Sequence, residues 1–215
     1  MKTLNFQIIT KDFNLNEEIE YLENIANVAV KSSAGVLQLR NKKISAHSLY
    51  NSALFLKKIL GGFNNINRPA LIINDRPDIA YMTGADGVHI GQDDIPAADV
   101  KKLFPGMIIG VSSENIEQAV QAEKNGADYI GAGPIYPTGS KQDAGDSMKR
   151  ETLTEMCKTV KIPVIAIGGI TELNIKELAV SGVSGVAVIS AVSNAENPLN
   201  EALKFRKNID EYLKQ

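Results

Sequence analysis

The feature that most constrains this 215-residue chain is the regular alternation of short apolar runs with stretches of helical pattern. Eight runs rich in Val, Ile and Leu recur about every 27 residues, close to the length of a compact strand-and-helix unit. They cover residues 4–10, 36–40, 70–74, 87–90, 107–112, 129–133, 163–168 and 185–190. Most are apolar on both faces, which is typical of strands in a parallel sheet covered by helices.

The segments between these runs carry amphipathic helix patterns with capping signals. Helices are predicted over residues 16–30, 46–60, 113–124 and 172–180, and from Pro198 to about residue 214. In the first of them, Ile19 and Leu22 are expected on the same buried stripe. Ser45 and Thr171 are the expected N-caps of the second and fourth.

Eight strands alternating with helices predict a closed (β/α)8 TIM barrel, an α/β fold. No Ser/Gly tract or charged block marks a linker, so one domain is expected over residues 1–215. An open doubly wound sheet is the alternative. It is disfavoured because no GxGxxG motif follows the first run.

Composition excludes several classes of protein. The chain has 23 basic and 25 acidic residues, without the basic excess of a nucleic-acid-binding surface. A single cysteine, Cys157, excludes an internal disulfide framework and a multi-cysteine zinc site. No apolar stretch of about 18 residues and no signal-peptide pattern is present, so we expect a cytoplasmic enzyme without a membrane partner. Assembly into a homo-oligomer stays open.

In such a barrel, active-site groups follow the C-terminal ends of the strands. Asp75 and Asp94 follow neighbouring runs and are predicted to share one Mg²⁺, which typically takes one or two carboxylates plus phosphate oxygens. A helix cap is the alternative role for Asp93 or Asp94. Arg40, Lys42 and Lys141 lie at the same rim and predict a clamp for a diphosphate. A salt bridge between Arg40 and Asp75 is the alternative for that arginine.

A second anion site is predicted after the seventh and eighth runs. Gly168 and Gly169, and then Ile189 and Ser190, each precede a predicted helix, and glycine lets an anion approach the backbone closely. Two anion sites imply two phosphorylated reactants.

No activated nucleophile is evident at this rim. Cys157 is expected to be a buried structural thiol, and His47 a surface residue of a helix. For His89 a packed core histidine and a site residue are equally favoured. Neither covalent catalysis nor a strong general base is therefore expected.

The chain resembles the thiamine-phosphate synthase family in seven stretches that follow the expected strands in order. They are QLRNK (38–42), INDR (73–76), GVHIGQDD (87–94), GVS (110–112), GADYIGAGPIYPTGSK (126–141), IGGI (167–170) and GVAVIS (185–190). The stretches span about three-quarters of the chain, and GADYIGAGPIYPT is the most specific.

This resemblance implies a Mg²⁺-dependent transferase of thiamine biosynthesis. Hydroxymethylpyrimidine diphosphate would lose diphosphate, and the nitrogen of hydroxyethylthiazole phosphate would attack the pyrimidine methylene to give thiamine phosphate. The residues implied to hold the pyrimidine diphosphate are Gln38, Arg40, Lys42, Asn74, Ser112 and Lys141, of which Lys141, Arg40 and Ser112 would act in catalysis. Those implied to hold the thiazole phosphate are Thr138, Ser140, Gly169, Ile189 and Ser190. Asp75 and Asp94 would bind Mg²⁺.

The sequence also departs from the family pattern in three places. Asn41 stands where the family usually has an acidic residue, Ser140 replaces a threonine, and the segment after Lys141 matches loosely.

Two rival functions are weighed against the synthase. A thiazole tautomerase-type isomerase would need an acid–base histidine after the sixth run, and residues 133–141 contain none. A non-catalytic phosphate-binding barrel would not need both carboxylates together with Lys141.

Overall fold

The computed structural model describes residues 4–63, 68–139 and 146–213. Its strands are all parallel and close into a barrel in chain order, with the first strand paired to both the second and the last. They are β1 (Phe6–Ile9), β2 (Val36–Leu39), β3 (Ala70–Asn74), β4 (Gly87–Ile90), β5 (Ile108–Ser113), β6 (Tyr129–Ala132), β7 (Val164–Ile167) and β8 (Gly185–Val188). The closed α/β barrel is therefore confirmed, and the open doubly wound sheet is wrong.

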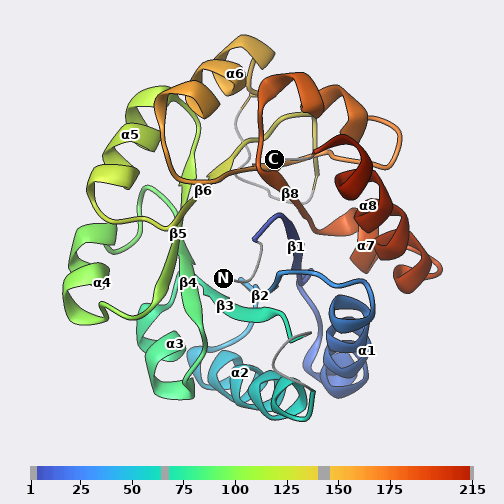
Figure 1. Cartoon of the computed structure of the whole chain (residues 1–215). Coiled ribbons are helices and arrows are strands. Elements are labelled where there is room, and N and C mark those ends of the chain that lie inside the picture. The colour runs from blue at the N-terminus through green and yellow to red at the C-terminus, as the bar shows by residue number, and fades with distance from the viewer. Residues whose placement is uncertain (1–3, 64–67, 140–145, 214–215) are drawn as a thin grey trace.

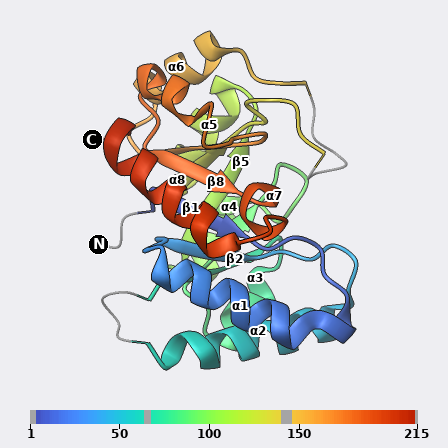
Figure 2. The ribbon, with the colours of Figure 1, turned by 90° about the vertical axis from the view of Figure 1, so that its right-hand side faces the viewer.

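Helices form a ring around the strands, as the view along the barrel shows (Figure 1). They are η1 (Leu15–Glu17), α1 (Glu18–Lys31), α2 (Ala46–Gly61), α3 (Pro77–Thr83), α4 (Ala97–Leu103), α5 (Ile116–Lys124), α6 (Arg150–Thr159), η2 (Ile175–Ser181), α7 (Ser190–Ser193) and α8 (Pro198–Tyr212). The ring closes where α8 packs beside α1 (Figure 2). In the part of the chain that the structure describes, no helix is long and apolar enough to cross a membrane.

Local sequence signals account for some helix ends and fail at others. The Ser45 hydroxyl caps α2 by accepting a hydrogen bond from the Ser48 amide, as predicted. The predicted start of α5 at Ser113 is wrong, because Ser113 ends β5 and Asn115 caps the helix. Thr171 is not a cap either, since the turn there shortens the predicted helix to η2. Ile19 is 63% exposed, so the buried stripe of α1 begins at Leu22.

The barrel interior is filled by side chains rather than open. One buried cluster unites Ile9, Tyr129, Ile165, Ala187 and Ile189 from the neighbouring strands β6, β7, β8 and β1 and the exit of β8. These strands are short and almost wholly buried, so they form a rigid frame whose C-terminal ends all point to one rim. The loops that leave this rim carry the residues considered next.

Candidate active site

A cavity of about 610 Å³ opens at the C-terminal ends of the strands, within the size range of small-molecule sites. Most of the residues that the sequence predicts for the site line it: Arg40, Lys42, Asn74, Asp75, Asp94, Ser112, Thr138, Gly169, Ile189 and Ser190. Gln38 does not line this cavity and is buried beside a smaller void in the barrel interior. Ser140 and Lys141 lie outside the described residues.

Two carboxylates face each other at the exits of β3 and β4. Asp75 has a left-handed backbone, with a φ of 62°, and its amide donates to the carbonyl of His89 at 2.8 Å. Such a conformation is uncommon for residues other than glycine and clusters at functional sites. The Asp94 carboxylate accepts a hydrogen bond from the Gly91 amide at 2.6 Å, which stabilises the turn between these two residues. Pro96 occupies the N-cap of α4 without a side-chain cap, so a capping role for Asp94 or Asp93 is wrong.

The environment of Asp75 disfavours its negative charge. Burial and the adjacent Asp94 carboxylate raise the pKa of Asp75 to about 6, against the opposing pull of Lys42 and Arg40. Two carboxylates that raise each other's energy in this way are suited to a divalent cation, which neutralises both. Within residues 4–63, 68–139 and 146–213, no group of three or more His, Cys, Asp or Glu side chains could hold a metal. The pair therefore fits Mg²⁺ with phosphate oxygens completing its shell, and does not fit an all-protein cage.

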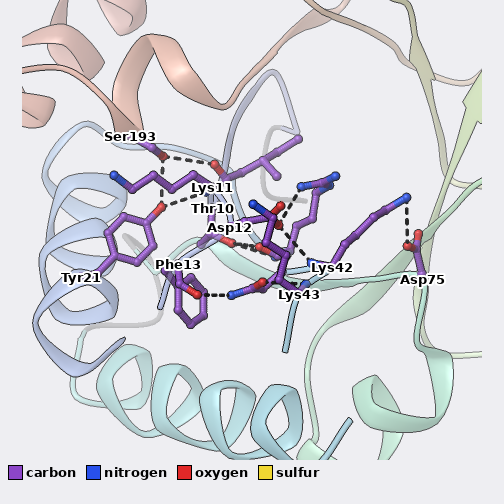
Figure 3. A network of polar contacts seen from close by, with 12 residues as sticks. Thr10, Lys11, Asp12, Phe13, Tyr21, Lys42, Lys43, Asp75 and Ser193 are labelled. Atoms are coloured by element: carbon purple, nitrogen blue, oxygen red, sulfur yellow. Dashed lines mark hydrogen bonds and ion pairs between the residues drawn. The ribbon is translucent and has the colours of Figure 1, made fainter. Parts of the chain in front are cut away.

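The basic side of the cavity is built around Arg40. Its side chain is 6% exposed and pairs with Asp12, with 3.2 Å between Nη1 and the carboxylate oxygen. The salt bridge considered between Arg40 and Asp75 is wrong, because Lys42 takes that place at 3.8 Å (Figure 3). The buried Nε of Arg40 has no hydrogen-bond partner among the described residues. A buried donor left unpaired beside a cavity is expected to meet an acceptor supplied by a ligand.

Thr10 and Asp12, which follow β1, hold this basic loop in place and were missed by the sequence predictions. The Thr10 hydroxyl accepts from the Arg40 amide at 2.8 Å and donates to the Arg40 carbonyl at 2.7 Å. Asp12 accepts from the Lys42 amide at 3.0 Å as well as from the Arg40 guanidinium (Figure 3). The signal that could have revealed Asp12 is an acidic residue at the exit of the first strand.

Asp12→Ala is expected to raise the KM for the diphosphate-bearing ligand about tenfold with a smaller change in kcat. The substitution removes the acceptor that positions both Arg40 and Lys42, and a misplaced clamp first costs binding. Asp12→Asn keeps an acceptor oxygen without the charge and is expected to recover part of the loss. Steady-state kinetics of both variants checks this, and an Ala variant with unchanged KM would contradict the positioning role of Asp12.

The contacts of Asn41 explain why an amide suits this position, where the resemblance implies an acidic residue. Its side-chain NH₂ donates to the Phe13 carbonyl at 2.8 Å, while its oxygen accepts from the Lys43 amide at 3.0 Å. A carboxylate could make the second bond but not the first. The residue is 6% exposed, so it ties the loop after β2 to the loop after β1 rather than facing a ligand.

The opposite side of the cavity is formed by the exits of β6, β7 and β8. Gly168 and Gly169 follow β7 with φ values of 99° and 62°, a region that favours glycine. A Cβ at Gly169 would lie 2.7 Å from both the Pro137 carbonyl oxygen and the Cβ of Tyr136. Glycine is therefore required here by the turn and by the packing of the loop after β6, besides any approach of an anion.

A buried hydrogen-bonded chain leads from the barrel interior to the cavity. Nδ1 of His89 lies 3.0 Å from the Tyr129 hydroxyl, and its Nε2 lies 2.9 Å from the hydroxyl of Ser112. Tyr129 is fully buried, whereas Ser112 is half-buried and lines the cavity. His89 is thus both a packed interior histidine and a lining residue, which resolves the two alternatives left by the sequence.

Cys157 and His47 lie away from this cavity. Cys157 is half-buried in α6, and burial raises the pKa of its thiol to about 11, which fits the predicted structural role. His47 is exposed on α2 and contacts Asn51 at 3.2 Å.

Comparison with known proteins gives one consistent family. A family model for thiamine monophosphate synthase matches residues 7–192. The thiamine-phosphate synthase of Methanobrevibacter smithii is 43% identical over 92% of each chain, and that of Methanocella arvoryzae is 41% identical over 95% of this chain and 94% of its own.

Solved structures give the same result. The thiamine phosphate pyrophosphorylase of Pyrococcus furiosus superposes with a TM-score of 0.84 at 35% identity, covering 99% of this chain and 98% of its own. A 3-hexulose-6-phosphate synthase, at 16% identity and a TM-score of 0.71 over 95% of this chain and 99% of its own, shares the fold alone. From the extent of the family match and the identity of these relatives, the chain belongs to the thiamine monophosphate synthase family.

Proposed function

We propose that this chain is a thiamine-phosphate synthase that joins hydroxymethylpyrimidine diphosphate to hydroxyethylthiazole phosphate. The observation that carries the proposal is the meeting of Asp75 and Asp94 in one cavity with the buried Nε of Arg40, which has no partner within the described parts of the chain. A diphosphate with Mg²⁺ supplies the acceptors and the positive charge that these three groups lack. The relatives named above carry the same activity in their names.

The reaction needs no general base. The bond between the pyrimidine methylene carbon and the diphosphate oxygen breaks, and its electron pair leaves with the diphosphate. A lone pair of the thiazole nitrogen then forms the new carbon–nitrogen bond, and because that nitrogen carries no proton, none has to be removed. This chemistry agrees with a rim that offers charged and hydrogen-bonding groups, and it leaves the contact between Ser112 and His89 to serve in binding rather than in nucleophilic attack.

The protein is proposed to stabilise the charge that develops on the departing diphosphate. Arg40 and Lys42 bind its oxygens from the β2 exit, and Ser112 donates to it from the β5 exit. Mg²⁺, held by Asp75 and Asp94, would supply Lewis-acid neutralisation of the leaving group. Lys141, which the resemblance assigns to the same task, is proposed to add a further positive charge.

The thiazole phosphate is proposed to bind across the cavity, at the exits of β6 to β8. Thr138, Gly169, Ile189 and Ser190 line this side, and Ser140 follows Thr138 by two positions in the sequence. Gly168 and Gly169 line the cavity at the β7 exit and carry no side chains of their own to shield their backbone amides. Binding of both ligands in the same cavity would also exclude water from the reactive pyrimidine methylene.

The discriminating experiment supplies the two substrates, singly and together, with and without Mg²⁺. Equimolar thiamine phosphate and diphosphate are expected only when both substrates and the metal are present. Isomerisation of a thiazole alone would identify a tautomerase, and binding without turnover would identify a passive phosphate-binding barrel. Cytoplasmic location and homo-oligomeric assembly stay predictions from the sequence.

A further inference from the structure

Tyr129, His89 and Ser112 form a chain of hydrogen bonds. The direction in which they donate along this chain can be inferred from which groups must donate and which can accept. Each member carries hydrogen-bonding groups that can donate or accept, so two opposite directions are geometrically equivalent. In one direction Tyr129 donates to Nδ1 of His89, and Nε2–H donates to Ser112. In the other direction Ser112 donates to Nε2, and Nδ1–H donates to Tyr129.

The surroundings of the Tyr129 hydroxyl distinguish the two directions of donation. The Tyr129 side chain is fully buried, and among the described residues the hydrogen-bond partner of its hydroxyl is Nδ1 of His89. Burial raises the pKa of Tyr129, so the hydroxyl keeps a proton that must be donated. In the reverse direction that proton would have no acceptor among the described residues, which is costly for a fully buried hydroxyl. The first direction satisfies it.

The direction of donation also determines the role of the Ser112 hydroxyl. If Nε2–H of His89 donates to the Ser112 oxygen, the Ser112 proton is left to point elsewhere. The Ser112 backbone is held by Gln92, whose Nε2 donates to its carbonyl at 2.6 Å. Ser112 itself lines the cavity, which is the open side available to its hydroxyl proton.

We propose that Tyr129 and His89 are positioning residues that fix the tautomer of the imidazole and make Ser112 a hydrogen-bond donor toward the ligand. The ligand atom facing Ser112 is then an acceptor. Its identity as a diphosphate oxygen rests on the function proposed above, whereas the direction of the chain does not.

Packing around the chain supports a specified geometry. A Cβ at Gly110 would collide with the Tyr129 ring and lie 2.5 Å from Nδ1 of His89. A Cβ at Gly131 would lie 2.9 Å from Cε1 of His89. The neighbouring strands β5 and β6 thus have glycine at the two positions where a side chain would collide with the imidazole or phenol ring.

Nitrogen NMR of the imidazole tests the direction without any substrate. The chain contains two histidines, so ¹⁵N-labelled protein carrying the surface substitution His47→Gln leaves His89 as the single imidazole signal. At about pH 8, above the ordinary range of histidine, we expect a protonated Nε2 and an unprotonated Nδ1. A protonated Nδ1, alone or in a doubly protonated ring, would overturn the proposal.

A double-mutant cycle tests the consequence for catalysis. Ser112→Ala is expected to lower kcat about 10²-fold, as for removal of one preorganised donor. Tyr129→Phe frees the tautomer and is expected to lower kcat about tenfold. In the Ser112→Ala background, Tyr129→Phe should have no further effect on kcat, because it acts through Ser112.

Controls separate this role from packing. Tyr50→Phe, on α2 outside the cavity, is expected to leave kcat and the His89 signal unchanged. A melting curve confirms that Tyr129→Phe is folded. If Tyr129→Phe costs the same in both backgrounds, its effect is one of packing and the proposal fails. An inactive wild-type protein that shows the expected tautomer would refute the proposed function and leave the direction of the chain standing.

Discussion

Asp75→Asn is expected to lower kcat/KM at least 10²-fold. A bound metal stabilises the transition state by several kcal/mol as a Lewis acid, and a loss of this size follows when that stabilisation is weakened. The variant loses one of the two charges proposed to bind Mg²⁺ but keeps the size of the side chain. Asparagine is chosen because it tolerates the left-handed backbone at this position, where φ is 62°. Alanine would add backbone strain to the loss of charge. Steady-state kinetics across a Mg²⁺ titration measures the effect.

The same substitution is expected to stabilise the metal-free protein. Burial and Asp94 raise the pKa of Asp75 from 3.8 to about 6. A raised pKa means that folding favours the protonated form of Asp75. The contribution of this group to the free energy of unfolding is therefore greatest at low pH and is lost as the pH rises through about 6. At about pH 8, removing the charge should add about 1–2 kcal/mol after allowance for partial exposure. That corresponds to roughly 2–8 °C in melting temperature.

Asp99→Asn is the matched control for this pair of effects. Asp99 is an exposed carboxylate in the first turn of α4 and does not line the cavity. Its replacement should leave both kcat/KM and the Mg²⁺ dependence as they are. Full Mg²⁺-dependent activity of the Asp75 variant would remove Asp75 from the metal site, and a lower melting temperature at pH 8 would contradict the account of its charge.

Arg40→Met is expected to lower kcat/KM by about 10²–10³-fold, the scale seen when one preorganised donor to a developing charge is removed. Methionine keeps much of the apolar stem but none of the guanidinium donors. The variant should also melt at a lower temperature, because Asp12 loses its partner in a largely buried pair. Kinetics with the diphosphate substrate varied measures the first effect, and calorimetry the second.

Arg206→Met is the control for Arg40. Arg206 lies on α8 and pairs with Asp210 and with Asn5, which precedes β1 at the opposite end of the barrel. It should change stability without changing turnover. An Arg40 variant with kcat/KM close to the wild type would exclude the guanidinium from the diphosphate clamp.

The barrel could be predicted because its determinants are local in sequence. Runs such as residues 70–74 are apolar on both faces, and each is followed by a helical segment, which leaves few alternatives for the fold. The rim followed from the barrel, since parallel strands in a closed sheet bring all their C-terminal ends together. Asp75 and Asp94 could thus be paired although they belong to different strand-and-helix units of the sequence.

The parts that could not be predicted depend on contacts between loops. Asp12 pairs with Arg40, which lies on the next strand exit, and the sequence alone equally allowed Asp75 as the partner. Gly169 is constrained by the backbone at Tyr136 and Pro137, and this contact exists only after the barrel has closed. Thr171 has the residue type of a cap, yet the Asn174 side chain satisfies the Thr171 amide and the turn tightens into η2.

The central claim is that one cavity holds a diphosphate with its metal on one side and a monophosphate on the other. A crystal structure of the protein with Mg²⁺, diphosphate and thiamine phosphate tests it most directly. The account predicts Mg²⁺ at about 2.0–2.1 Å from oxygens of Asp75 and Asp94, with the diphosphate on Arg40 and Lys42. It predicts the phosphate of thiamine phosphate at the exits of β7 and β8. Metal bound elsewhere, or both anions on the same side of the cavity, would contradict it.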